Sequence, residues 1–142
     1  MNIIGPNSIS DLPSVKFDGL WRVLGCLPET DETLSRFQTF GSAVRGALDP
    51  SQWQEIDMSW YAPPILDQGM TSSCVGHGSC SGMESCWMQS GKPLVQFNPY
   101  FVYGLINGGR DQGAFISDAL VAMQKYGICP KGDLPQGVMY QN

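Results

Sequence analysis

Hydrophobic and polar positions in the second half of the chain recur at helical spacing and predict three helices. The first is expected to start after Ser72 or Ser73, either of which can cap it, and to run to about Gln89, with Gly91 beyond its end. This segment holds a single charged residue and three interior glycines, each of which costs about 1 kcal/mol relative to alanine. We therefore expect a buried central helix that other backbone approaches closely at its glycines.

Two shorter helices are predicted after the first. The second starts at Pro99 with Asn98 as its cap, and it ends near Gly108. The third runs from about 114 to 126, and Gly127 ends it. Their apolar faces consist of Phe101, Val102, Leu105 and Ile106 in the second helix, and of Phe115, Ala119, Leu120 and Met123 in the third. With little indication of strands, the predicted fold class is mainly α.

The first 60 residues lack this periodicity, because Pro, Gly, Ser and Asp interrupt it every few residues. One short helix is predicted over 31–44, where apolar residues recur at helical spacing. The chain is therefore expected to divide into an extended, irregular N-terminal arm over 1–60 and a helical domain over 61–142. Three aromatic side chains near this boundary are expected to pack in the core: Trp53, Trp60 and Tyr61.

Composition narrows the possible functions. Charged residues make up 15% of the chain, against about 25% in a typical soluble domain, so part of the surface is expected to lie against a partner. The net charge of −5 and the lack of a Lys/Arg cluster argue against nucleic-acid binding. No apolar run approaches the roughly 20 residues that span a bilayer, and no signal peptide is seen. Five cysteines without a disulfide framework favour a reducing, cytoplasmic location.

The clearest candidate for chemistry is Cys74, at the start of the first predicted helix. A thiol there lies at the positive end of the helix dipole, which favours the nucleophilic thiolate. Gln68, on the preceding loop, can meet a developing oxyanion together with the backbone N–H of Cys74. The alternative is a small buried cysteine without chemistry, since free cysteine is among the most buried residue types.

Other reactive side chains on this helix have structural interpretations. His77 lies three residues after Cys74 on the same face, whereas a catalytic base should approach across a cleft, oriented by a third group. Glu84 is about 15 Å along the helix axis from Cys74, so it is expected to hold neighbouring groups. Cys74, His77, Cys80 and Cys86 span too wide an arc of one helix for a tetrahedral zinc site. No metal and no cofactor are expected.

The sequence resembles the bacterial and phage branch of the papain-like cysteine peptidases. That family carries Gln-Gly-x-Cys-Gly-Ser-Cys-Trp, and Gln68 and Cys74 keep the six-residue spacing between its oxyanion-hole glutamine and its nucleophile. Glu84 falls where the family has a glutamate on the same helix. The similarity covers roughly 24–130 and includes the segments 24–28, 56–59, 111–120 and 126–130. It implies the helical lobe of that fold, with Cys74 and Gln68 as catalytic residues and Gly113 presenting backbone to an extended peptide.

The chain also departs from this family. Thr71 replaces a cysteine that would form a disulfide, and Val75 replaces Trp or Tyr. The family places its His and Asn roughly 130–150 residues after the cysteine, on a β-rich lobe. Here 68 residues follow Cys74 (142 − 74 = 68), and the one histidine among them is His77, three residues after the cysteine. The β-rich second lobe is therefore expected to be absent.

These observations favour a non-catalytic structural or interaction protein, for example a phage virion component. A protein partner or a second copy of the chain would cover the face left by the missing lobe. One alternative is the nucleophile-bearing half of a cysteine peptidase, which receives its histidine from another segment. Another is a peptide-binding or inhibitor-like module that uses the remaining half of the cleft.

Overall fold

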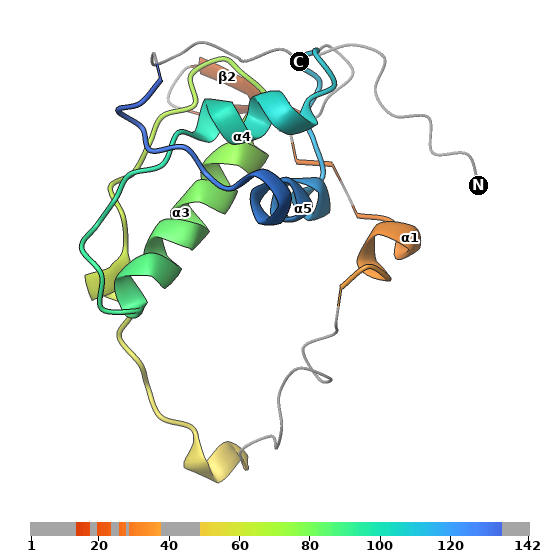
Figure 1. The fold of residues 1–142 in the computed structure, drawn as a ribbon. Coiled ribbons are helices and arrows are strands. Elements are labelled where there is room, and N and C mark those ends of the chain that lie inside the picture. The colour runs from red at the N-terminus through yellow and green to blue at the C-terminus, as the bar shows by residue number, and fades with distance from the viewer. Residues whose placement is uncertain (1–13, 18–19, 24–25, 28, 38–48, 135–142) are drawn as a thin grey trace.

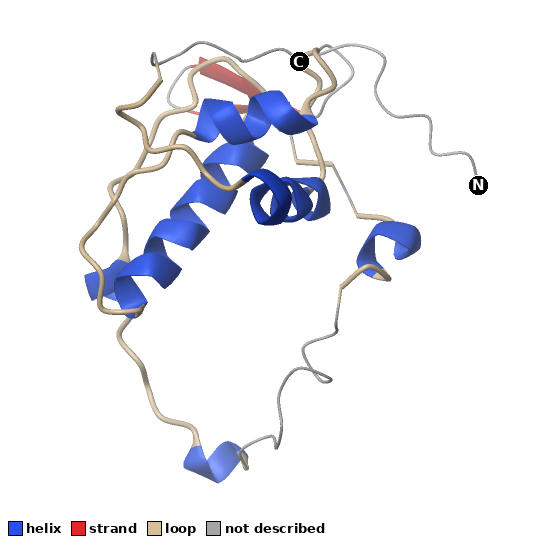
Figure 2. Cartoon of the chain, in the orientation of Figure 1, coloured by secondary structure: helices blue, strands red, loops and turns tan. Residues whose placement is uncertain are grey.

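The computed structural model describes residues 14–17, 20–23, 26–27, 29–37 and 49–134. The described part is mainly helical, as predicted, and three mutually contacting helices form its body (Figures 1 and 2). These helices are α3 (Cys74–Gln89), α4 (Pro99–Ile106) and α5 (Ile116–Tyr126). None of the described helices is both long and apolar enough to cross a membrane.

The predicted bounds of α3 are confirmed, but its start is not capped as expected. Ser73 occupies the N-cap position, yet its side chain makes no capping hydrogen bond. Its hydroxyl lies 2.6 Å from the Thr71 hydroxyl and 3.2 Å from Nδ1 of His77 instead. At the other end, Gly91 has a φ of 79°, a conformation that favours glycine, and so follows the helix as predicted.

The two shorter helices begin in different ways. As predicted, α4 starts at Pro99, and the Asn98 side chain accepts hydrogen bonds from two backbone N–H groups of its first turn. The N-terminus of α5 is capped from a distance: both carboxylate oxygens of Glu29 accept hydrogen bonds of 2.8 Å from Ser117, one from its N–H and one from its hydroxyl. This contact ties the N-terminal segment to the helical body. Gly127, with a φ of 78°, ends α5.

The core lies between α3, α4 and α5. It is formed by Val75, Cys80, Phe97, Val102, Tyr103, Ala114, Ala119 and Met123. A Cβ atom on Gly76 would lie 2.5 Å from the carbonyl oxygen of Pro99, which confirms the predicted close approach at this glycine. At Gly78 and Gly82, no atom of the described residues lies within 4 Å of such a Cβ. The prediction of a buried central helix is therefore wrong for one face of α3, on which both glycines are exposed.

The N-terminal part contains an antiparallel hairpin that the sequence analysis missed, formed by β1 (Ser14–Phe17) and β2 (Leu20–Val23). Of the helix predicted over 31–44, α1 (Asp31–Leu34) is present, and residues 38–44 lie outside the described part of the chain. Both strands and α1 have four residues each, and the predicted division into an irregular arm and a helical domain stays a prediction.

The segment before α3 runs outside the helical body. It contains the short 3-10 helices η2 (Pro50–Gln52) and η3 (Ser59–Tyr61). Figure 1 shows η2, in yellow, away from the three helices, whereas η3 contacts α3. Trp53 is 72% exposed and Trp60 is 85% exposed. The prediction that these two indoles pack in the core is therefore wrong, because the segment does not pass between the helices. Tyr61 is half-buried.

Candidate functional site

Cys74 is the first residue of α3 and is half-buried. The loop before it contains the predicted turn, in which the Asp67 carboxylate accepts a 2.8 Å hydrogen bond from the N–H of Gly69, and Gly69 has a φ of 63°. With 16 residues, α3 is long enough to direct the positive end of its dipole at its first turn, which contains no acidic residue. The local structure therefore places the thiol where the sequence predicted it.

A hydrogen-bond network anchors the loop before Cys74 to the segment after α4. One carboxylate oxygen of Asp111 accepts hydrogen bonds of 2.8 Å from both the N–H of Ser72 and the hydroxyl of Tyr103. The Tyr103 hydroxyl in turn accepts a 3.1 Å hydrogen bond from the N–H of Gly113. Burial and the bond to Asp111 raise the pKa of Tyr103, so the phenol remains a neutral donor. Sequence analysis did not identify this network, because its members are brought together only by the fold.

Gln68 lies on the loop that leads into the helix begun by Cys74, and one N–H of its side-chain amide is already hydrogen-bonded within that loop. Its Nε2 donates a 2.8 Å hydrogen bond to the carbonyl oxygen of Thr71. The backbone carbonyl of Gln68 accepts from the Thr71 hydroxyl at 2.8 Å and from the Tyr100 hydroxyl at 3.3 Å. A side-chain amide has two N–H donors, so the bond to Thr71 fixes the amide and leaves one donor for another acceptor.

His77 makes its hydrogen bonds to Ser73 and not to Cys74. Its Nδ1 lies 3.0 Å from the Ser73 carbonyl oxygen and 3.2 Å from the Ser73 hydroxyl. The edge of the Tyr100 ring contacts the imidazole, with ring centroids 5.3 Å apart. Burial lowers the pKa of His77, against the opposing effect of the Ser73 carbonyl. These contacts support the structural interpretation of this histidine.

Glu84 and Gly113 are both buried and both serve the fold. Glu84 is fully buried, and its carboxylate accepts a 2.7 Å hydrogen bond from the N–H of Phe97, which confirms its predicted structural role. Gly113 has a φ of 81° and donates its N–H to the Tyr103 hydroxyl. Since that N–H is bonded internally, only other backbone atoms of Gly113 are left to meet an extended peptide, and its binding role stays a prediction.

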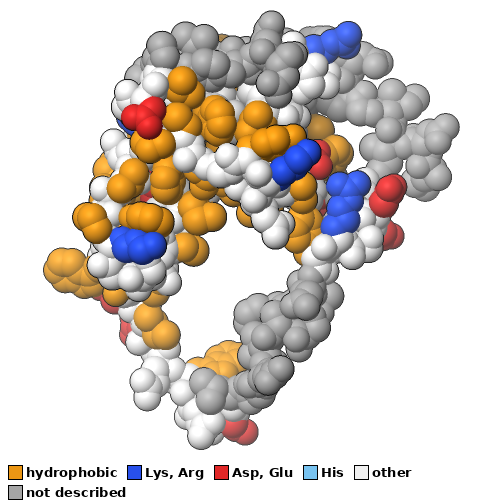
Figure 3. Space-filling model, in the orientation of Figure 1, with side chains coloured by type: hydrophobic (Ala, Val, Ile, Leu, Met, Phe, Trp, Pro, Cys, Tyr) orange, Lys and Arg blue, Asp and Glu red, His pale blue; other side chains and the backbone are white. Residues whose placement is uncertain are grey.

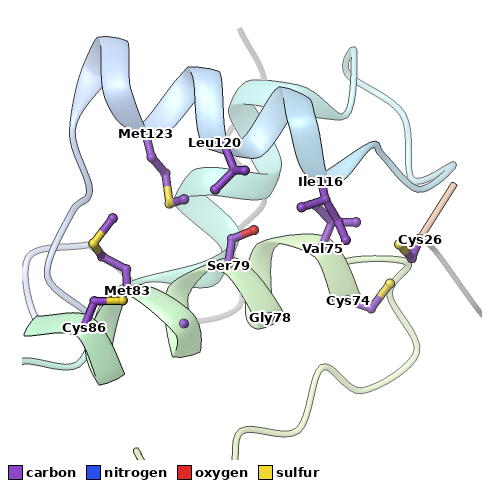
Figure 4. A pocket seen from close by; sticks show the side chains of 11 residues that line it. Cys26, Cys74, Val75, Gly78, Ser79, Met83, Cys86, Ile116, Leu120 and Met123 are labelled. Carbon is purple, nitrogen blue, oxygen red and sulfur yellow. The ribbon is translucent and has the colours of Figure 1, made fainter. Parts of the chain in front are cut away.

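An apolar groove of about 540 Å³ lies between α3 and α5 and reaches Cys74 at one end (Figure 4). One face of α3 forms its floor with Val75, Gly78, Ser79, Gly82, Met83 and Cys86, and α5 contributes Ile116, Leu120 and Met123. Cys26, from the N-terminal segment, completes the lining. Its volume falls within the range of ligand and side-chain pockets. The α3 residues recur every three or four positions, so they share one face of the helix. This helical spacing is the signal in the sequence from which the face could have been predicted.

Hydrophobic side chains also cover much of the surface over α3, α4 and α5, with few charged side chains among them (Figure 3). Within the described ranges, no group of three His, Cys, Asp or Glu side chains is arranged to hold a metal ion. None of the protein-family models, curated proteins or solved structures compared with this chain matches it. The resemblance to papain-like peptidases therefore rests on the motif residues alone.

Proposed function

We propose that this chain is a non-catalytic interaction protein with the architecture of a papain-like helical lobe, in which a protein partner covers the groove between α3 and α5. The observation that carries this proposal is the open face of the central helix. Large apolar side chains stand exposed along the groove on both helices: Met83, Ile116 and Leu120. Burying apolar surface contributes about 25 cal/mol per Å², so covering this groove is a strong source of binding free energy.

The glycines of α3 support an approaching partner. Gly76 is explained by the Pro99 carbonyl oxygen, because a side chain there would collide with α4. Gly78 and Gly82 have no such neighbour within the described structure, and both line the groove. Each costs about 1 kcal/mol of helix stability relative to alanine. A partner backbone that lies on these two positions, as Pro99 lies on Gly76, would explain why small residues occupy them.

The non-catalytic part of the proposal rests on the surroundings of Cys74. An active thiolate needs a base or another stabilising group beside it. His77 is the only histidine of the sequence, and its hydrogen bonds go to Ser73. The described residues thus do not supply the imidazole that a papain-like peptidase uses, and the groove is the feature left to carry the function.

Replacing Leu120 with aspartate tests the groove, and Val121→Asp is the matched control. The two side chains are neighbours on α5 and equally exposed, at 43% and 41%, but only Leu120 lines the groove. We expect Leu120→Asp to lower the fluorescence of bound anilinonaphthalene sulfonate at least about two-fold, because a charge in the groove repels apolar ligands. Val121→Asp should leave it unchanged. Circular dichroism verifies that both variants are folded.

Light scattering on the same proteins identifies one possible partner. If a second copy covers the groove, the wild-type protein and Val121→Asp are dimers and Leu120→Asp is a monomer. If the partner is a different protein, all three are monomers and only the fluorescence differs. Equal behaviour of the two aspartate variants in both measurements would contradict the proposal.

A second candidate function is the nucleophile-bearing half of a cysteine peptidase. The observation that favours it is the position of Cys74 at the first residue of α3 and at the end of an open groove, with Gln68 on the loop before it. In that function Cys74 attacks a peptide carbonyl, Gln68 and a backbone N–H hold the oxyanion, and a histidine comes from another segment or chain. The groove would then be the face that meets the segment carrying this histidine.

Labelling by a peptide-like thiol electrophile between pH 5 and pH 9 separates the two functions. The non-catalytic proposal predicts slow labelling that rises only above about pH 8, as for an ordinary thiol. Fast labelling at pH 6 that disappears in Cys74→Ser, but persists in Cys86→Ser, would instead favour the peptidase. Cys86 is the matched control because it is an exposed thiol lining the same groove.

A further inference from the structure

Two thiols from distant parts of the sequence lie at the same end of the groove. Cys74 begins α3, and Cys26 belongs to the N-terminal segment, yet both line the groove, and Figure 4 shows their side chains together at the end where α5 begins. Cys26 is exposed and Cys74 is half-buried. A small oxidant in solution can therefore reach this pair directly.

The fold holds the Cys26 segment firmly at this position. Cys26 forms an isolated parallel bridge with Ala114, and the N–H of Leu27 donates a 3.0 Å hydrogen bond to the Ala114 carbonyl oxygen. Two residues further on, Glu29 caps α5 through Ser117. Since α5 packs on α3, these contacts keep Cys26 next to the first turn of α3 and its thiol near Cys74.

The other cysteines are poorly placed for the same reaction. Cys80 is fully buried in the core, and burial raises the pKa of its thiol to about 12. Cys129 has its pKa raised as well and lies next to a bridge between Phe97 and Pro130, away from the groove. Cys86 is exposed, but it comes twelve positions after Cys74 on α3, about 18 Å along the helix axis.

We propose that Cys26 and Cys74 form a reversible disulfide that fastens the N-terminal segment to the start of α3 and blocks the thiol of Cys74. The oxidant is a low-molecular-weight disulfide. The Cys26 thiolate attacks one of its sulfurs, which forms a mixed disulfide and releases one small thiolate. The Cys74 thiolate then attacks the Cys26 sulfur, forms the internal disulfide and releases the second thiolate. The protein loses two protons and two electrons, and the small disulfide is reduced to two thiols.

Such a bond would act as a switch on the groove. It closes a loop of 48 residues (74 − 26 = 48), so it constrains the unfolded chain strongly. It also removes the only thiol at the start of α3 and fixes one end of the groove. The inference does not depend on whether the groove binds a partner or whether Cys74 is a nucleophile, because it rests on the placement of the two sulfurs.

The test is oxidation of the full chain with oxidised glutathione, followed by peptide mapping without reduction. We expect a monomer that has lost two hydrogen atoms, a linked pair of peptides containing Cys26 and Cys74, and complete reversal by dithiothreitol. The melting temperature of the oxidised protein should exceed that of the reduced protein by about 5 °C or more. Cys86→Ser should behave as the wild type.

The single variants Cys26→Ser and Cys74→Ser provide the decisive controls. Each should lose the linked peptides and retain a stable glutathione adduct on the remaining cysteine of the pair, since no second thiol is there to displace it. A different pairing in the wild type, disulfide-linked dimers, or stable adducts on both cysteines would overturn the inference. None of these results would affect the dye-binding test of the groove, so the two proposals fail independently.

Discussion

Replacing Gly76 with alanine is expected to destabilise the protein by about 3 kcal/mol, a large effect for the addition of one methyl group. The new Cβ atom would lie 2.5 Å from the Pro99 carbonyl oxygen and 3.1 Å from Cβ of Tyr103. The first neighbour is backbone and the second is attached directly to it, so neither can turn away. The first turn of α4 must therefore move, and the core around Tyr103 with it. Urea unfolding followed by circular dichroism measures the change.

The matched controls are the other two glycines of the same helix. Gly78→Ala and Gly82→Ala add the same methyl group where nothing in the described part of the chain lies within 4 Å. Each should stabilise the isolated chain by up to about 1 kcal/mol, the difference in helix propensity. If all three variants had similar stability, α4 would not approach α3 at Gly76 as described, and the division of α3 into a packed face and an open face would be wrong.

Local sequence features predicted the helices well because each helix end is specified by a few neighbouring residues. The Asn98 cap and the adjacent Pro99 fixed the start of α4, and Gly127 fixed the end of α5. The structural role of Glu84 was also predictable, since a single carboxylate in an apolar helix must find a hydrogen-bond donor. Such features act within one helical turn, so an isolated sequence contains all the information they need.

Features that depend on contacts between distant segments were not predicted. The start of α5 is capped by Glu29, and the loop before Cys74 is held by Asp111, which comes 39 residues after Ser72. The three glycines of α3 look alike in the sequence, but only the path of α4 distinguishes Gly76 from the other two. The open groove follows from the same cause, because an apolar helix face is buried or exposed according to what packs on it.

The candidate site combines both kinds of feature, those specified by neighbouring residues and those that depend on distant contacts. The sequence motif placed Gln68 and Cys74 at one loop–helix junction, as the structure has them. The position of that loop relative to α4 is decided by Asp111 and Tyr103, which no local pattern indicated. The surroundings of the thiol are therefore a tertiary property, and a substitution at Asp111 examines them without altering any residue of the motif.

Asp111→Ala is expected to destabilise the protein by about 3 kcal/mol. It removes the only side chain that accepts from both the N–H of Ser72 and the hydroxyl of Tyr103, and each buried donor left without a partner costs about 1–3 kcal/mol. Ser72 and Tyr103 are fully buried, so water cannot easily replace the carboxylate. Asp111→Asn keeps one acceptor oxygen and should cost roughly half as much. Equilibrium unfolding in urea gives both values.

Tyr103→Phe completes a double-mutant cycle with Asp111→Ala. If the two side chains act as one network, the double variant should lose less unfolding free energy than the two single variants lose together, by about 1 kcal/mol or more. The reason is that the second substitution removes a donor that the first left unpaired. Asp133→Ala, at an exposed carboxylate, should change stability by less than about 0.5 kcal/mol. A cost for Asp111→Ala as small as this control, or strictly additive effects in the cycle, would show that the loop before Cys74 is held by other contacts.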